Sequence, residues 1–183
     1  MKKSLLALPV LIALTACNDS SSDAKEEVQE TQEEVVSLET TKVQLQFNLP
    51  SGSELLDTQK FTYDDMLSYN ASVSTLVCKP DGSKIDLAVN FVHVEQDKWD
   101  VYFKLNDEFL NVDNGVIGGT GQTKATIEFD ENGDFIRQIP YIINSTAIQD
   151  SGIIYQIELD FYTDVTTNID ESFNAKNLNS NGC

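Results

Sequence analysis

The sequence predicts an all-β domain over residues 40–183, built as a single antiparallel β-sandwich or a partly closed β-barrel. Two observations support this class. Apolar and polar residues alternate in one run after another beyond Thr40, and no stretch has the 3.6-residue periodicity of a long amphipathic helix. Seven or eight short strands separated by turn residues, over about 140 residues, are typical of sandwiches and barrels.

The first strands of the domain are expected to form an antiparallel meander. In each strand alternate residues are apolar, so one face of the strand is buried. Strand 71–78 leads through a Lys-Pro-Asp-Gly turn at 79–82 into the next strand, as in a hairpin. The apolar faces of the other early strands are Val43, Leu45, Phe47 and Leu49; Ile85, Leu87, Val89 and Phe91; and Trp99, Val101, Phe103 and Leu105.

The stretch IEFDENGDFI, residues 127–136, has the spacing of oxygen-bearing residues that begins a calcium loop. An EF-hand needs Gly at its sixth position and Glu at its twelfth, but Phe135 and Tyr141 stand there. We therefore expect a hairpin between strands 124–129 and 135–139, with Asn132-Gly133 in a type I′ turn. A last strand is expected over 153–161, and the glycine-containing span 106–121 is expected to be a mobile loop.

Residues 1–16 have the features of a secretory signal: Lys2 and Lys3, then a short apolar run, then small residues. Its end, Leu-Thr-Ala-Cys at 14–17, resembles a bacterial lipobox. The resemblance implies cleavage before Cys17 and acylation of Cys17, which would anchor the chain in a membrane. Asn18 then implies the outer membrane. The alternative is an ordinary signal peptide with a chance cysteine at its cleavage site.

Residues 17–39 are polar and acidic, lack aromatic residues and cannot form a core, so we expect a flexible tether. A short helix that docks on a partner is the alternative, because Val28, Thr31, Val35 and Leu38 have heptad-like spacing. The chain has a net charge of −18, which becomes −20 once the signal and its two lysines are removed. Nucleic acid is therefore an unexpected partner, since polyanion binding needs clustered Lys and Arg.

Two cysteines remain in the domain, Cys78 and Cys183. In an oxidising compartment they can form a disulfide with each other, which would close a loop of about 100 residues. Two free thiols, or an intermolecular bond through Cys183, are the alternatives. Sequence alone does not show whether the two Cα atoms approach closely enough for a bond.

The sequence offers no catalytic centre, so we expect no enzyme, no metal and no cofactor. His93 is the single histidine, with no serine elbow or nucleophile-like cysteine to serve, and we expect it at a strand end and a sheet edge. Tyr102 is expected to point outward, where a sugar-stacking platform is conceivable. Three acidic pairs lie in expected loops as solvated surface: Asp64-Asp65, Asp107-Glu108 and Asp130-Glu131.

From about Thr40 to Gly182 the chain resembles the outward-facing second domain of the bacterial flagellar hook protein and related axial proteins. The likeness lies in TTKVQLQFNL, SYNASVSTLV and, most specifically, DLAVNFVHVEQDKWDVYFKL. It extends to the Phe-Asp-x-Asn-Gly hairpin at 129–133 and to IELDF followed by SFNAKNLNSNG. The resemblance implies the fold and a flagellar setting, as an interaction protein of the rod, hook or rings.

The departures from that family are at the two ends of the chain. Family members carry terminal segments that pack as helices into the tubular axis, whereas here a lipobox and an acidic tether precede the domain. We therefore expect an outer-membrane lipoprotein of the periplasmic face that assists the hook or basal body without polymerising in the family's way. The alternative is an envelope module that uses the same fold to bind another ligand, such as a glycan.

Overall fold

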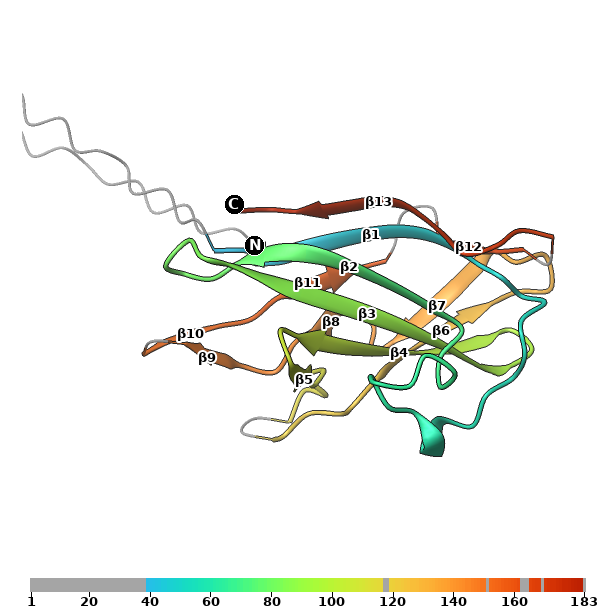
Figure 1. Ribbon diagram of the computed structural model, residues 1–183, viewed down its shortest axis with the longest axis horizontal. Coiled ribbons are helices and arrows are strands. Elements are labelled where there is room, and N and C mark those ends of the chain that lie inside the picture. The colour runs from blue at the N-terminus through green and yellow to red at the C-terminus, as the bar shows by residue number, and fades with distance from the viewer. Residues whose placement is uncertain (1–38, 117–118, 151, 162–164, 169, 183) are drawn as a thin grey trace, which may run out of the picture. The chain divides into compact units, whose positions relative to one another are not determined.

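The computed structural model describes residues 39–116, 119–150, 152–161, 165–168 and 170–182 (Figure 1). The chain divides into two compact units, Met1–Val35 and Val36–Cys183, and all described residues belong to the second. The expected signal, Cys17 and nearly all of the expected tether lie outside the described residues. None of the helices within the described ranges is long and apolar enough to cross a membrane.

The described residues form two β-sheets, a small hairpin and one short 3-10 helix, η1 (Thr58–Lys60), which confirms the all-β class. The first sheet contains β1 (Lys42–Leu49), β8 (Ile143–Asn144), β11 (Glu158–Asp160), β12 (Thr166–Thr167) and β13 (Asn174–Ser180). The second contains β2 (Ala71–Cys78), β3 (Lys84–Glu95), β4 (Lys98–Leu105), β5 (Glu108–Leu110), β6 (Ala125–Phe129) and β7 (Phe135–Ile139). The hairpin is β9 (Ile148–Asp150) with β10 (Ile153–Tyr155).

The second sheet is the expected antiparallel meander. Its strand order is β2-β3-β4-β6-β7, and each neighbouring pair is antiparallel. The first sheet is mixed. Its central strand β1 pairs antiparallel with β13 on one side and parallel with β11 and β12 on the other, an arrangement that the sequence analysis did not predict. Figure 1 shows β13 and β1 running together along one side of the domain.

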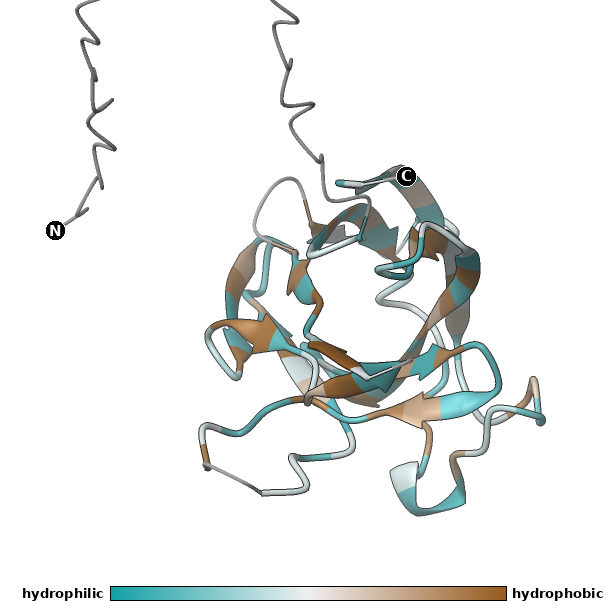
Figure 2. Ribbon diagram, turned by 90° about the vertical axis from the view of Figure 1, so that its left-hand side faces the viewer, coloured by the Kyte–Doolittle hydropathy of each residue, from teal (hydrophilic) through white to brown (hydrophobic). Residues whose placement is uncertain are grey.

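A single apolar core fills the space between the sheets. The rings of Phe47 from β1 and Phe91 from β3 have centroids 4.6 Å apart, and Phe161 meets Phe47 at 5.5 Å. Trp99 and Phe103 are fully buried, as predicted. Burying such side chains contributes about 1.5–3 kcal/mol each. Figure 2 shows the strands around this interior, with hydrophobic and hydrophilic residues alternating along them.

The sheets approach each other at both edges, which gives a partly closed barrel. At one edge the Thr40 amide donates to the Cys78 carbonyl at 2.9 Å, and the Cys78 amide donates to Thr40 Oγ1 at 2.9 Å. At the other edge the Asp113 amide donates to the Asn144 carbonyl at 2.8 Å. These bonds satisfy backbone groups that an open sheet would leave exposed.

The hairpin at residues 129–135 is confirmed, but the expected type I′ turn is wrong. That turn needs positive φ at both central residues, whereas Gly133 has φ 83° and Asn132 does not have a positive φ. The Gly133 amide donates to the Asp130 carbonyl at 3.0 Å, and the Asp130 amide donates to the Asp134 carbonyl at 2.9 Å. This pattern is a three-residue connection with Gly133 at the left-handed position, and the turn at 79–83 repeats it with Gly82.

Two other expectations need correction. The predicted strand 153–161 is two strands, because residues 153–155 pair with β9 while residues 158–160 pair with β1 and β8. The span 106–121 is partly ordered: β5 pairs with β4, and the buried Val112 forms bridges to Gln122 and Ser145. An apolar side chain with a place in the core fixes this part of the span.

Candidate functional site

The cysteines predicted as site residues are only partly described. Cys78 is the last residue of β2, is 1% exposed and is disulfide-bonded. Cys17 and Cys183 lie outside the described residues, so the lipidation of Cys17 and the pairing of Cys78 with Cys183 stay predictions.

The final described residues nevertheless lie near Cys78. Asn181 Oδ1 accepts hydrogen bonds from the Thr41 and Lys42 amides at 2.9 and 2.7 Å, and the Asn181 amide donates to the Lys42 carbonyl at 3.0 Å. Thr40, the preceding residue on that segment, bonds to Cys78 as described above. Asn181 is therefore held one short segment away from Cys78.

His93 lies near the end of β3, beyond the last residue that pairs with β2, which confirms its expected place at a strand end and sheet edge, but it is buried at 2% exposure. Its ring stacks on Trp99 with centroids 4.3 Å apart and planes 6° apart. Nδ1 lies 3.0 Å from the Ser53 carbonyl and 3.1 Å from Ser53 Oγ, and Nε2 lies 3.1 Å from the Gln96 carbonyl. Both nitrogens thus contact neighbouring loops, which is an anchoring role rather than that of a general base.

A polar cleft of about 550 Å³ lies at the end of the domain where three turns meet. Its acidic residues are Asp97, Asp130 and Glu131. The Asp130 carboxylate accepts hydrogen bonds from the Asn132 and Asp134 amides, both at 2.9 Å. The Asp134 bond is the main cause that lowers the pKa of Asp130, so this group stays ionised and is unsuited to act as a general acid.

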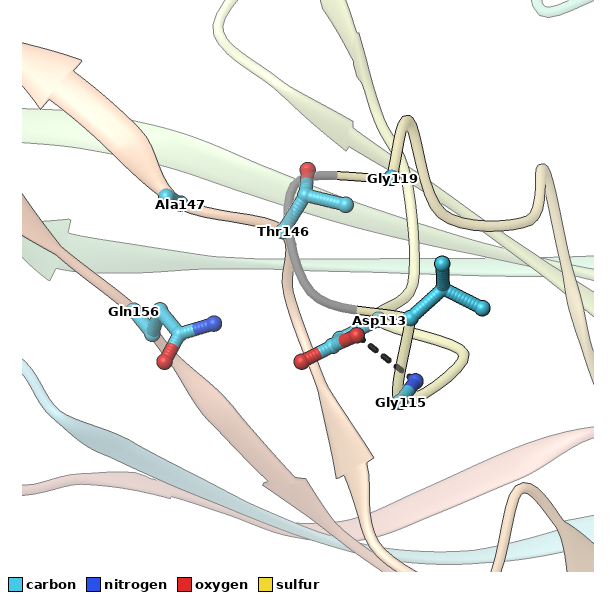
Figure 3. A pocket seen from close by; sticks show the side chains of 7 residues that line it. Asp113, Gly115, Gly119, Thr146, Ala147 and Gln156 are labelled. Carbon is cyan, nitrogen blue, oxygen red and sulfur yellow. Dashed lines mark hydrogen bonds between the residues drawn. The ribbon is translucent and has the colours of Figure 1, made fainter.

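A second hollow, of about 220 Å³, lies between the loop after Val112 and two connections, the one from β8 to β9 at residue 146 and the one from β10 to β11 at residue 156 (Figure 3). Asp113 is the single acid in its lining, and its carboxylate accepts a hydrogen bond from the Gly115 amide at 2.8 Å. The described residues of the lining include no histidine, cysteine or lysine. Across the described part of the chain, moreover, no group of three or more His, Cys, Asp or Glu side chains is placed to hold a metal ion.

Tyr102 lies on the outer face of the second sheet, as predicted, but it is only 6% exposed, so the alternative of an open sugar-stacking platform is wrong. The ring of Phe61, from the loop that precedes β2, stacks on it with centroids 3.8 Å apart. The Tyr63 hydroxyl from the same loop donates to the Phe103 carbonyl, and Lys104 Nζ lies 5.9 Å from the Tyr63 ring centroid. A loop of this chain thus occupies the place where a sugar would stack.

Burial of these phenols predicts a loss of stability in alkali. Burial is the main cause that raises the pKa of Tyr102 to about 12, and it also raises the pKa of Tyr63. The folded state holds the phenolic proton more tightly than the unfolded state does. The protonated phenol therefore contributes to the free energy of unfolding in full below pH 10, and this contribution is lost between about pH 10 and 12. Over that range we expect tyrosinate absorbance to rise and Trp99 fluorescence to fall together.

The matched variant is Tyr102→Phe, which keeps the ring stacked on Phe61 but removes the ionisable hydroxyl. It should unfold at a higher pH than the unaltered protein, despite losing the Tyr102 hydrogen bond to Thr58. An unfolding profile with the same pH dependence in both proteins would contradict this account.

The loop of residues 50–70 was not predicted as a surface feature. Asp57 caps η1 through the Gln59 amide at 3.0 Å, and the loop carries the aromatic residues that cover Tyr102. The signal was available: Phe61 and Tyr63 stand in a stretch rich in acids and turn residues, where aromatic side chains indicate a docked segment rather than a solvated one.

Three comparisons relate this fold to known proteins. The family model described as "Flagellar basal body protein FlaE D2 domain" matches residues 48–183. The flagellar hook protein FlgE of Escherichia coli (strain K12) is 29% identical over 97 residues, which is 53% of this chain and 22% of that protein. A 32 kDa fragment of the flagellar hook protein FlgE from Caulobacter crescentus superposes with a TM-score of 0.43 and 14% identity, covering 62% of this chain and 46% of that one.

The match over residues 48–183 confirms the family resemblance found in the sequence. That match spans well over half of the chain. The chain belongs to the family of the flagellar basal body protein FlaE D2 domain.

Proposed function

We propose that this protein is an outer-membrane lipoprotein whose hook-like β domain acts as a structural or accessory interaction protein of the flagellar hook and basal body. The observation that carries the proposal is the family match over residues 48–183 in a chain that also has a lipobox-like sequence ending at Cys17. Acyl chains on Cys17 would hold the domain at the periplasmic face of the membrane, and residues 18–39 would give it reach.

The proposed role is non-enzymatic. The groups most able to do acid–base or nucleophilic chemistry are occupied structurally: both His93 nitrogens contact backbone carbonyls, Asp130 closes a turn, and Cys78 is disulfide-bonded. The family is named for a part of the flagellar basal body. Because Phe61 covers Tyr102, the aromatic ring on which the glycan-binding alternative depends is not open to a sugar.

The proposal predicts co-purification with intact hook–basal bodies of the source organism. In mass spectrometry of those particles, this protein should be enriched at least severalfold over an equally abundant envelope lipoprotein, which serves as the contamination control. Deletion of the gene should reduce swimming in soft agar, and expression of the unaltered chain should restore it. A Cys17→Ser chain should fail to restore swimming, because it lacks the acyl anchor.

Absence from well-loaded particles, together with normal swimming of the deletion strain, would overturn the proposed role. Rescue by the Cys17→Ser chain would overturn only the lipid anchor. The family assignment would stand in both cases, because it rests on the match over residues 48–183.

A further inference from the structure

The loop of residues 50–70, here named the anchored loop, is fixed to the second sheet at both of its ends. The Leu56 amide donates to the His93 carbonyl at 2.8 Å, and the His93 amide donates to Asn70 Oδ1 at 2.7 Å. Asn70 Nδ2 in turn donates to the Glu54 carbonyl at 2.8 Å, which joins the two ends of the loop. The backbone of His93 therefore binds both ends of the anchored loop.

The middle of the anchored loop is fixed as well. Phe61 is stacked on Tyr102, and the Ser68 hydroxyl donates to the Thr62 and Asp65 carbonyls at 2.6 and 2.8 Å. These contacts hold the loop in one conformation before any partner arrives. Figure 1 shows η1, within this loop, projecting from the body of the domain.

The anchored loop exposes three large apolar side chains, here named the apolar crest: Leu55, Met66 and Leu67, exposed by 54, 78 and 85%. Leu55 and Leu67 line one hollow of about 250 Å³, so they are neighbours in space. The Leu67 amide is capped by Asp65 Oδ1 at 2.9 Å, which fixes the backbone that carries Leu67. Apolar side chains gathered on an ordered surface are typical of a protein interaction site.

Carboxylates stand next to the residues of the apolar crest in the chain, and Glu54 and Asp57 line the hollow beside it. Glu54 precedes Leu55, the pair Asp64-Asp65 precedes Met66, and Asp57 and Lys60 lie on the intervening segment. The rim thus carries four acids and one base. A second copy of this chain would place acids against acids, which disfavours self-association through this face.

We propose that the apolar crest is a docking surface for a protein partner whose contact face has an apolar centre and a rim of Lys and Arg side chains. Leu67 and Met66 would fill the apolar centre, and the acidic rim would speed association and set orientation. Because the loop is already ordered, little conformational entropy is lost on binding. The inference goes beyond the proposed function, because it specifies the partner's chemistry whether or not the partner is flagellar.

The test is site-specific photocrosslinking in living cells with the full chain. A benzophenone amino acid replaces Leu67 in one variant and Ile154 in another, since Ile154 on β10 is 68% exposed and lies outside the anchored loop. We expect a discrete adduct from position 67 and at least tenfold less from position 154. The adducted protein, identified by mass spectrometry, should have Lys or Arg residues around the crosslinked point.

A third variant adds Glu54→Gln and Asp64→Asn to the position-67 probe, which removes rim charge but keeps the Asp65 cap. Its adduct yield should fall severalfold while its unfolding midpoint stays unchanged. An unaltered yield, an adduct with a second copy of this chain, equal yields from positions 67 and 154, or no adduct from position 67 would each overturn the inference. A position-67 adduct with a basic protein outside the flagellum would support the docking surface and count against the proposed function.

Discussion

Replacing Cys78 or Cys183 by serine is expected to lower the free energy of unfolding by roughly 4–5 kcal/mol. In the chain-entropy model, a cross-link that closes a loop of about 100 residues raises the free energy of the unfolded state by that amount, because it reduces the conformational entropy of the unfolded chain. The expectation rests on the pairing of these two cysteines, which we propose. Guanidinium denaturation followed by the fluorescence of Trp99, the single tryptophan, measures it.

The hydrogen bonds around Thr40 support this pairing. Cys78 is disulfide-bonded, and its backbone is hydrogen-bonded to Thr40. The residues that follow Thr40 are hydrogen-bonded to Asn181. Cys183 follows Asn181 by two residues, whereas Cys17 is separated from Thr40 by more than twenty. In the proposed lipoprotein the Cys17 thiol is acylated and so unable to pair.

A double-mutant cycle distinguishes the bond from the separate effects of two substitutions. If Cys78 pairs with Cys183, the double variant should be about as stable as either single variant, and a reductant should destabilise only the unaltered protein. Additive losses, or a reductant effect that persists in Cys183→Ser, would show that Cys78 has another partner.

The strands that could be predicted from the sequence are those with one buried face. In β1 and β4, and in β3 as far as Phe91, an apolar residue occurs at every second position, because a strand that packs on a core buries one set of alternate side chains. In β2 the same alternation is interrupted by Thr75. The hairpin between β6 and β7 was also predictable, since its turn residues stand between two such strands. Its turn type was not, because Asn-Gly is compatible with more than one connection.

Strand β13 could not be predicted by the same reasoning. Its sequence, NAKNLNS, is polar and has no apolar alternation, and the strand is held by backbone pairing with β1 along most of its length. The parallel pairing of β1 with β11 and β12 could not be predicted either. Residues 158–160 and 166–167 are more than a hundred residues away in sequence, and no local pattern indicates which strand they join.

The candidate surface was missed for a related reason. His93 is a lone histidine in the sequence, and only the fold brings Ser53, Gln96 and Asn70 around it. Tyr102 points outward as its strand alternation predicts, but a loop some forty residues earlier covers it. Alternation indicates which side of a sheet a residue occupies, and not what another segment places over it.

Gly133→Ala is expected to lower the free energy of unfolding by roughly 3 kcal/mol. A Cβ at this position would lie 2.0 Å from the Thr167 carbonyl oxygen, and Gly133 has φ +83°, which an alanine adopts only with strain. The unfavourable φ costs about 1–2 kcal/mol, and displacing a packed backbone costs a further 1–3 kcal/mol. The close approach joins the two sheets, because the Thr167 amide donates to the Gly133 carbonyl at 3.0 Å and Thr167 pairs with β1.

Gly152→Ala is the matched control for this substitution. Gly152 also has φ +83°, but nothing lies within 4 Å of the position that its Cβ would take, so only the strain of about 1–2 kcal/mol applies. Denaturation of both variants under the same conditions therefore isolates the contact with Thr167. If the two variants lose equal amounts of unfolding free energy, the backbone near Gly133 can move away from Thr167 without an energetic penalty. The stability of the hook-like domain would then not depend on this junction between its sheets.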